Sequence, residues 1–283
     1  MSEPPNEKAV QAARMFDVLS TSYDAVGVDF FGPIADQLVG HLSPARGESL
    51  IDIGCGKGQV LIRAAKHVGQ TARLMGIDVS PGMLDQARAV LDRAGLARVE
   101  LREMDAQDPH LDGELFDIVA SSLVLFFIPD PVRALGSWRT LLAPAGRIGI
   151  TTFGGRDPRW EEVDSVFTPY LPAGMLDART SGANGPFASD DGVAGLFREA
   201  GFSSVQTWNT DVDVTLTDAA HWRTWTMSVG QRAMWEAVPA DKVAEVQEHA
   251  TERLSNCIGD DGQIHLTQTI RTTLAGVTPG SAE

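Results

Sequence analysis

The chain has 283 residues, a formal net charge of -15 at pH 7 and 43% hydrophobic residues. This apolar content is enough for the core of one large domain, or of one domain with a sizeable insertion. The acidic balance argues against nucleic acid as a partner, because each phosphate contact needs a cation. Binding to a membrane surface would also need a cluster of basic residues, and the sequence has none.

Cysteines and apolar segments limit the class of protein further. The longest apolar stretch, residues 118–129, is well short of the roughly 20 residues that cross a bilayer. The N-terminus has no apolar signal region, so we expect a cytoplasmic protein. Cys55 and Cys257 give neither a disulfide framework nor zinc spacing, so we expect no metal. A small-molecule partner fits this composition, and a homodimer is compatible with it.

The first half of the chain alternates between helical and strand patterns. Apolar residues at helical spacing predict helices over 9–19 and 32–42. Strands that alternate with helices after them predict a parallel sheet. The expected strands are 49–53, 73–77, 99–103, 116–121 and 146–153, and the helices between them end near residues 69, 94 and 142.

Beyond residue 153 the pattern changes. The expected elements are helices over 160–170, 189–201 and 241–256, strands over 205–216 and 263–274, a loose stretch over 171–190 and a tryptophan-rich segment over 219–238. We divide the chain into N-terminal helices (1–45), a core (46–153), and the end of the core sheet (154–283). Insertions at about 154–190 and 217–260 are expected to form a helical cap over the carboxyl ends of the strands.

The run from Leu50 to Gly58 is the most informative segment. A short apolar strand ends at Asp52 and opens into glycines at alternate positions, where the chain must turn sharply and leave room for a ligand on bare backbone. The dinucleotide fingerprint would place its third glycine where Gln59 stands. A carboxylate at Asp52 suits a cationic ligand better than a phosphate. The alternative is a tight strand–helix turn with no ligand.

Acids and serines follow the other expected strands. Asp78, Asp105, Ser121 and Ser122 all stand where a strand ends, and ligands of open α/β sheets bind at that edge. The spacing from the glycine loop to Asp78 suits a carboxylate on ribose hydroxyls. An acid after a strand can also be the N-cap of the next helix.

Two segments carry a family resemblance. The run from Asp52 to Gly58 resembles motif I of the class I methyltransferases that use S-adenosylmethionine. Residues 16–24 resemble the N-terminal signature of the quinone-biosynthesis methyltransferase group and its small-molecule relatives. The resemblance covers about residues 15–152, with a weaker similarity over 187–205. It implies an α/β fold with a Rossmann-like, doubly wound, seven-stranded sheet, mostly parallel with the last strand antiparallel.

The resemblance also implies a cofactor site. S-adenosylmethionine would lie with its methionine end near Asp52 and Gly54, its ribose on Asp78 and its adenine on Met83, under Tyr23 from the N-terminal helices. The full set of expected cofactor-binding residues is Tyr23, Asp52, Gly54, Cys55, Gly56, Asp78, Val79, Met83, Asp105, Ala106, Ser121 and Ser122.

Methyl transfer mainly requires that the acceptor atom be held in line with the S–CH₃ bond. A base is needed only when the acceptor must lose a proton early. Many relatives carry a His-His pair after the fourth strand, where this chain has Phe126 and Phe127. The remaining catalytic candidates are His221, which we prefer, Tyr23 and Tyr170. Each can instead be a structural residue.

The tryptophan-rich segment is the best indication of the acceptor. Aromatic residues can wall an apolar pocket and attract a cation, or can simply form the core of the cap. The expected substrate-binding residues are Phe126, Phe127, Phe153, Trp222, Trp225 and Arg232, the arginine orienting an acceptor or pairing with an acid.

These features favour transfer to a hydrophobic or heteroaromatic small molecule of secondary metabolism. Carbon or nitrogen acceptors, for example an indole-type ring, are slightly preferred. The alternatives are an O-methyltransferase acting on a phenol or quinol, a methyltransferase-fold cyclase, a non-catalytic binding protein and a nicotinamide-dependent oxidoreductase.

Overall fold

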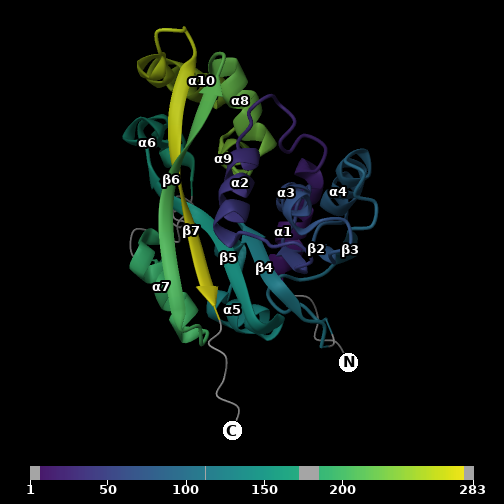
Figure 1. Cartoon of the computed structure of the whole chain (residues 1–283). Coiled ribbons are helices and arrows are strands. Elements are labelled where there is room, and N and C mark those ends of the chain that lie inside the picture. The colour runs from purple at the N-terminus through teal and green to yellow at the C-terminus, as the bar shows by residue number, and fades with distance from the viewer. Residues whose placement is uncertain (1–6, 112, 172–184, 277–283) are drawn as a thin grey trace.

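The computed structural model describes residues 7–111, 113–171 and 185–276 (Figure 1). Seven strands form one sheet in the order β3-β2-β1-β4-β5-β7-β6. Their bounds are β1 Leu50–Ile53, β2 Leu74–Asp78, β3 Glu100–Glu103, β4 Phe116–Ser122, β5 Leu142–Arg156, β6 Ser204–Leu216 and β7 Ile264–Gly276. The first five strands pair in parallel, and β7 runs antiparallel between β5 and β6. The predicted fold class is confirmed.

Helices cover both faces of the sheet. On one face, α2 (Phe31–Leu42), α3 (Gln59–Val68) and α4 (Pro81–Arg93) pack on the strands, and on the other lie α5 (Pro131–Thr140) and α7 (Asp190–Glu199). Every residue of β1 and β2 is buried, as is typical of parallel strands covered on both sides. The sheet order reverses between β1 and β4, which opens a crevice at their carboxyl ends.

Serine side chains start two of these helices. The Oγ of Ser80 accepts from the Met83 N–H at the start of α4, and Pro81 occupies the first helical position. Ser189 accepts from the Gly192 N–H in the same way at the start of α7. Both are N-caps that satisfy an otherwise unpaired backbone donor.

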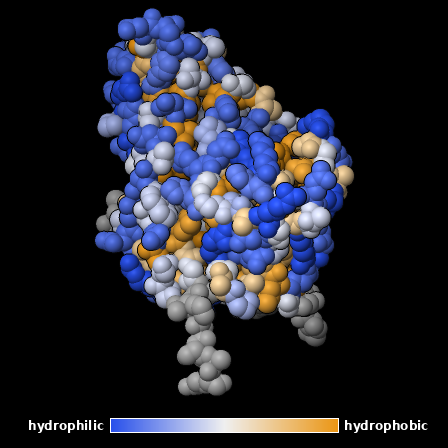
Figure 2. All heavy atoms as spheres, viewed as in Figure 1, coloured by the Kyte–Doolittle hydropathy of each residue, from blue (hydrophilic) through white to orange (hydrophobic). Residues whose placement is uncertain are grey.

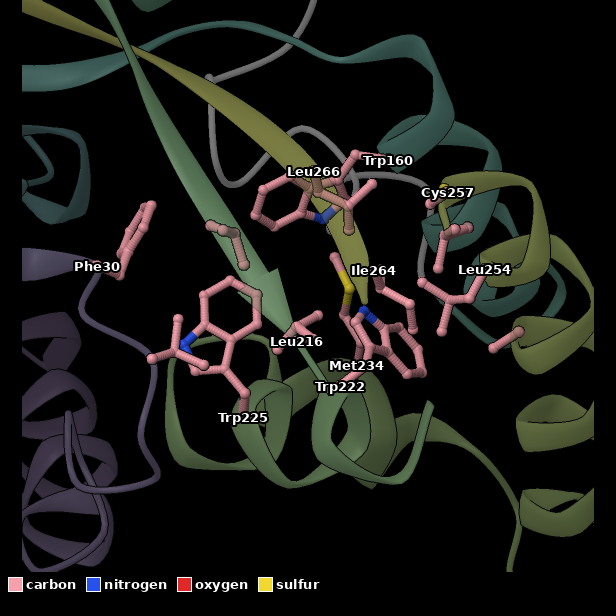
Figure 3. Close-up of a cluster of buried hydrophobic side chains, with 14 of the residues drawn as sticks. Phe30, Trp160, Leu216, Trp222, Trp225, Met234, Leu254, Cys257, Ile264 and Leu266 are labelled. Carbon is pink, nitrogen blue, oxygen red and sulfur yellow. The ribbon is translucent and has the colours of Figure 1, made fainter. Parts of the chain in front are cut away.

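A second core lies where β6 and β7 extend past the other strands (Figure 1). We call this region the cap; it comprises α6 (Pro158–Asp164), the 3-10 helix Ser165–Tyr170, α8 (Ala219–Ser228), α9 (Arg232–Ala237) and α10 (Val243–Leu254), with the ends of β6 and β7. Its buried side chains include four tryptophans, some of which appear in Figure 3. The face in Figure 2 is mostly hydrophilic, and hydrophobic residues show between the cap and the rest of the molecule.

Several expected helices end earlier than predicted. The helix expected over 160–170 is α6 to Asp164 and then a 3-10 helix that contains Pro169, because proline cannot supply the N–H of a continuing α-helix. The helix expected to reach 142 ends at Thr140, and Leu142 already belongs to β5. The helix expected over 241–256 ends at Leu254. Most of the loose stretch expected over 171–190 lies outside the described residues.

The N-terminal helix α1 (Glu7–Leu19) is attached to the start of α4. Asp17 Oδ1 accepts hydrogen bonds from Ser80 Oγ at 2.5 Å and from the Gly82 N–H at 2.9 Å. Lys57 Nζ donates to the carbonyl of Tyr23, which ties the segment after α1 to the glycine loop. These contacts place Tyr23 over the carboxyl ends of β1 and β2.

Among the described residues, no helix combines the length and apolar character that crossing a membrane requires. The same residues contain no group of three or more His, Cys, Asp or Glu side chains placed to hold a metal ion.

Candidate functional site

The glycine loop after β1 adopts a backbone that requires glycine. Gly54, Gly56 and Gly58 have φ angles of 72°, 49° and 80°, in the region where a Cβ is costly. A Cβ on Gly54 would also lie 2.4 Å from Cγ2 of Val124. The N–H groups of Gly54 and Cys55 both donate to the carbonyl of Ile77, at 2.8 and 2.9 Å. The loop is therefore folded back onto the end of β2.

Asp78 at the end of β2 holds the loop in place. Its buried carboxylate accepts from the Gly56 N–H at 2.8 Å and from the Ser80 N–H at 3.0 Å. Burial raises the pKa of this carboxyl, and the backbone hydrogen bonds oppose that shift. One carboxylate thus connects the glycine loop with the start of α4.

A cavity of about 110 Å³, which we call the donor cavity, lies beside this loop. Nine of the residues expected to bind the cofactor line it: Tyr23, Gly54, Gly56, Asp78, Val79, Met83, Asp105, Ala106 and Ser122. Sequence reasoning missed other lining residues, among them Phe16, Leu123, Val124 and Ile128. Phe16 stands in the N-terminal segment that resembles the methyltransferase signature. The other three residues follow β4 at the edge of the sheet where ligands bind. The positions of all four in the sequence therefore indicate a place near the cofactor.

A smaller compartment of about 70 Å³ lies under Tyr23 and contains Asp52. Asp52 is 1% exposed, and its Oδ1 has no hydrogen-bond partner among the described residues. Burial, with the nearby charge of Asp78, raises the pKa of Asp52 to about 8. A buried carboxylate oxygen without a partner is costly. A cationic group of a ligand in this compartment would satisfy it.

Two residues of the expected cofactor set are placed differently. The hydroxyl of Ser121 donates to the carbonyl of Ile53 at 2.8 Å, and Ser121 is 1% exposed. Ser121 lines neither the donor cavity nor the compartment around Asp52, and its hydrogen bond joins β4 to β1. Cys55 lines the small compartment, and its Sγ packs closely against Gly76. A Cβ at position 76 would lie only 2.8 Å from this sulfur atom. Burial raises the pKa of the Cys55 thiol, which therefore stays neutral.

A third cavity of about 220 Å³, the acceptor cavity, adjoins the donor cavity. The two share Phe16, Tyr23, Leu123 and Phe127 in their walls. The acceptor cavity is also lined by Phe126, Phe127, Phe153 and Trp225, all expected to bind substrate, and by Met15, Phe30, Phe31, Trp160, Val229, Gly230, Gln231, Ala233, Met234 and Gln268. Side chains from the cap and from the loop after β4 thus meet around one apolar space.

Trp222 and Arg232 lie outside this cavity, contrary to expectation. Trp222 is fully buried and packs on Phe167 and Trp235 inside the cap, whereas Trp225 on the same helix faces Phe30 (Figure 3). Arg232 pairs with Glu236 at 2.7 Å beside a separate open groove. Trp222 is therefore core, and the arginine pairs with an acid.

Two of the three candidate bases, His221 and Tyr170, lie outside the lining of the acceptor cavity. His221 Nδ1 lies 3.2 Å from the Thr217 N–H, and Nε2 lies 2.8 Å from the carbonyl of Val26. Nδ1 must accept and Nε2 must donate, so the neutral ring already has both partners. Tyr170 ends the 3-10 helix of the cap and does not line the acceptor cavity.

Tyr23 lines all three compartments and stacks on Phe31, with ring centroids 4.7 Å apart. Burial, with the nearby charges of Asp24 and Asp78, raises the pKa of its phenol far above the ordinary value. The hydroxyl therefore stays protonated at neutral pH. Tyr23 is the sole titratable side chain among the described residues that line the acceptor cavity.

Comparison with known proteins assigns the family. A family model described as a methyltransferase domain matches residues 44–181. Nocamycin O-methyltransferase from Saccharothrix syringae is 34% identical over 245 residues, which span 82% of this chain and 86% of that protein. This chain belongs to the S-adenosylmethionine-dependent methyltransferases. Aklanonic acid methyltransferase from a Streptomyces species is 38% identical over 167 residues, or 59% of this chain and 76% of that protein.

Solved structures share the fold. The cyclase SpnF matches with a TM-score of 0.58 and 17% identity, over 99% of this chain and 100% of that one. Phosphoethanolamine N-methyltransferase 2 from Haemonchus contortus, in complex with phosphomonomethylethanolamine and S-adenosylhomocysteine, has a TM-score of 0.58 and 15% identity, over 95% of this chain and 59% of that one. At such identities these structures show the fold alone.

This methyltransferase uses S-adenosylmethionine and acts on small molecules. The alternative of a nicotinamide-dependent oxidoreductase is therefore wrong. The compartment around Asp52 fits the cofactor, because S-adenosylmethionine is cationic and the unpartnered Oδ1 requires a cation or a donor.

Proposed function

We propose that this methyltransferase methylates an oxygen that is already ionised at neutral pH, a carboxylate or an acidic enol, on a largely apolar small molecule. The observation that carries the proposal is the described lining of the acceptor cavity, in which Tyr23 is the sole titratable side chain. Because Tyr23 stays protonated, none of the described lining residues is placed to accept a proton early in the reaction. An acceptor that arrives deprotonated needs no such base.

An apolar cavity favours methyl transfer from a cationic donor to an anionic acceptor. The acceptor is anionic, S-adenosylmethionine supplies an activated methyl group on a cationic sulfur when bound, and the two charges cancel as the methyl moves. A low-dielectric site solvates the separated charges of the reactants less well than water does, and the transition state, in which these charges partly cancel, loses less solvation. Aromatic walls that exclude water, such as Phe126, Phe153 and Trp225, therefore assist the reaction without a catalytic side chain.

The residues divide into two groups by location. Asp52 would meet a cationic part of the cofactor, Asp78 its ribose hydroxyls, and Met83 with Asp105 and Ala106 its adenine. Phe16, Tyr23, Leu123 and Phe127, which line both cavities, would hold the acceptor oxygen against the methyl group. Orientation of this kind accounts for a large part of the rate of a transfer between two bound molecules.

The relatives' names support an oxygen acceptor. One is called an O-methyltransferase, and the named substrate of another is an acid. A second candidate, transfer to carbon or nitrogen of a heteroaromatic ring, is favoured by the aromatic faces of Trp225, Phe126 and Phe153. These faces would stabilise the positive charge that a neutral acceptor gains.

The test is a set of matched acceptors with S-adenosylmethionine labelled in its methyl group. We would compare 2-naphthoic acid, 4-hydroxycoumarin as an acidic enol, 2-naphthol and indole. We expect transfer to the first two, with release of labelled methanol when the naphthoate product is treated with alkali. 2-Naphthol should react on the order of 100-fold more slowly, because it must lose a proton. Transfer to indole alone would contradict the proposal and support the second candidate.

A further inference from the structure

We infer that Gln231 and Gln268 select acceptors that carry a hydrogen-bond donor, in the first place a hydroxyl group, on the part of the molecule remote from the transferred methyl. The inference rests on the proposed function in one respect, the assignment of this cavity to the acceptor. Both glutamines line the acceptor cavity, and neither lines the donor cavity. They are 5% and 3% exposed.

The amide of Gln268 has a fixed orientation. Its Nε2 donates to the carbonyls of Gly155 and Thr269, each at 2.9 Å. Gly155 lies in the irregularity of β5 between Phe153 and Arg156, where the register with β7 shifts. A flipped amide would set Oε1 against two carbonyl oxygens, so both hydrogens must point there. The oxygen Oε1 is therefore the atom of Gln268 that remains for a ligand.

The amide of Gln231 has a fixed orientation as well, set by the ion pair of Asp164 with Arg156. Its Nε2 donates to Asp164 Oδ1 at 3.0 Å, and Asp164 Oδ2 accepts from Arg156 Nη1 at 2.9 Å. A flipped amide would bring Oε1 against the carboxylate of Asp164, which is unfavourable. Gln231 therefore also directs its nitrogen into the protein and keeps Oε1 for the cavity.

Two buried carbonyl oxygens in an apolar cavity discriminate among ligands. A buried acceptor that loses water and finds no donor costs free energy, so a ligand with a hydroxyl there binds better than one with an ether or a hydrogen. An anion at this position would be repelled, which leaves the ionised oxygen for the side shared with the donor cavity. The favoured acceptor is thus an apolar molecule with an acidic oxygen at one end and a hydroxyl at the other.

The test is equilibrium binding with S-adenosylhomocysteine present, so that no transfer takes place. We would titrate 2-naphthol and 2-methoxynaphthalene, which share a ring system but differ in the ability to donate, by calorimetry. Wild-type protein should bind 2-naphthol about five- to tenfold more tightly, the effect of one satisfied buried acceptor. Gln268→Met and Gln231→Met should each narrow this ratio, and the double variant should bring it within about twofold of unity.

Gln263→Met is the matched control, because Gln263 bonds to exposed Asp261 and does not line the cavity. It should keep the wild-type ratio, and all variants should bind S-adenosylhomocysteine as before. Equal affinity of the wild type for 2-naphthol and 2-methoxynaphthalene would overturn the inference. This measurement needs no variant, so it stands even if a variant fails to fold. A ratio unchanged in the folded double variant would do the same. Failure of carboxylate methylation would instead count against the proposed function, since this assay needs no turnover.

Discussion

The donor cavity and the acceptor cavity share four side chains but are held together by different forces. The donor cavity depends on backbone: positive φ angles at three glycines, and N–H groups that bond to Ile77 and to Asp78 within a short stretch of chain. The acceptor cavity depends on side-chain packing between α1, the loop after β4, β5, β7 and the cap. The first arrangement leaves little freedom for substitution, whereas the second can be reshaped residue by residue. A methyltransferase built in this way can keep its cofactor and change its acceptor.

The sharpest contrast is expected between two glycines of the loop. Gly54→Ala combines a left-handed backbone with a contact of 2.4 Å to Val124. It should destabilise the fold by about 2–5 kcal/mol and weaken S-adenosylhomocysteine binding at least on the order of 100-fold. Gly58→Ala has the same backbone cost, but its Cβ meets only Leu91 at 3.7 Å, so it should cost about 1–2 kcal/mol. Urea unfolding and calorimetry give both values. Similar results for the two variants would show that packing against Val124 is unimportant.

The second prediction concerns Asp52, whose pKa is raised to about 8 by burial. A cationic ligand needs the ionised form, so affinity for S-adenosylmethionine should rise by up to about tenfold per pH unit from pH 6 to about 8 and then level off. Asp52→Asn should bind on the order of 100-fold more weakly at pH 8 and lose this dependence. Calorimetry across pH provides the measurement. A wild-type affinity that is flat between pH 6 and 8 would contradict the assignment.

Stability without ligand should follow the opposite trend. The folded state holds the Asp52 proton more tightly than the unfolded chain, in which the pKa of this carboxyl is near its ordinary value of 3.8. This contribution is fully present below about pH 4 and is lost as the pH rises through about 8. Asp52→Asn should therefore remove part of the fall in unfolding free energy over this range. An identical slope in both proteins would show that Asp52 does not titrate there.

The contrast between the donor cavity, which depends on backbone, and the acceptor cavity, which depends on side-chain packing, explains how much of the structure could be predicted from the sequence. Alternating glycines after a strand, and acids or serines at the ends of the next three strands, are local patterns, so the sheet and the residues around the donor cavity could be predicted. Gln231 and Gln268 gave no such signal, because an amide becomes a cavity residue only through partners such as Asp164 and Gly155. Val26, which accepts from His221, lies 195 residues away in the chain.

Trp222 and Trp225 show the same limit on a single helix. They stand three residues apart on α8, so helical spacing places them on neighbouring parts of its surface. Which of them meets the cavity depends on how α8 packs against α9 and on Phe30, Phe167 and Trp235. Sequence alone has no access to that packing.

These two tryptophans supply a further prediction. Trp225→Phe should raise the acceptor KM about three- to tenfold with little loss of stability, because its ring lines the cavity. Trp222→Phe should leave the KM near the wild-type value and lower the unfolding free energy by about 1–3 kcal/mol, because its ring fills the cap core. Steady-state kinetics and urea unfolding of both variants separate the two roles. A larger change in KM for Trp222→Phe than for Trp225→Phe would reverse the assignment.

The smallest effect on activity is expected from His221. Both ring nitrogens have protein partners, Thr217 and Val26, and the side chain does not line the acceptor cavity. His221→Ala should therefore lower the unfolding free energy by about 1–2 kcal/mol through lost hydrogen bonds and keep kcat within about threefold, with an unchanged pH profile. His221→Gln, which can still donate to Val26, should recover part of the stability. A base in the reaction would instead lose at least on the order of 100-fold in kcat in both variants. The Gln variant therefore decides whether His221 joins the cap to the N-terminal segment or takes part in the transfer.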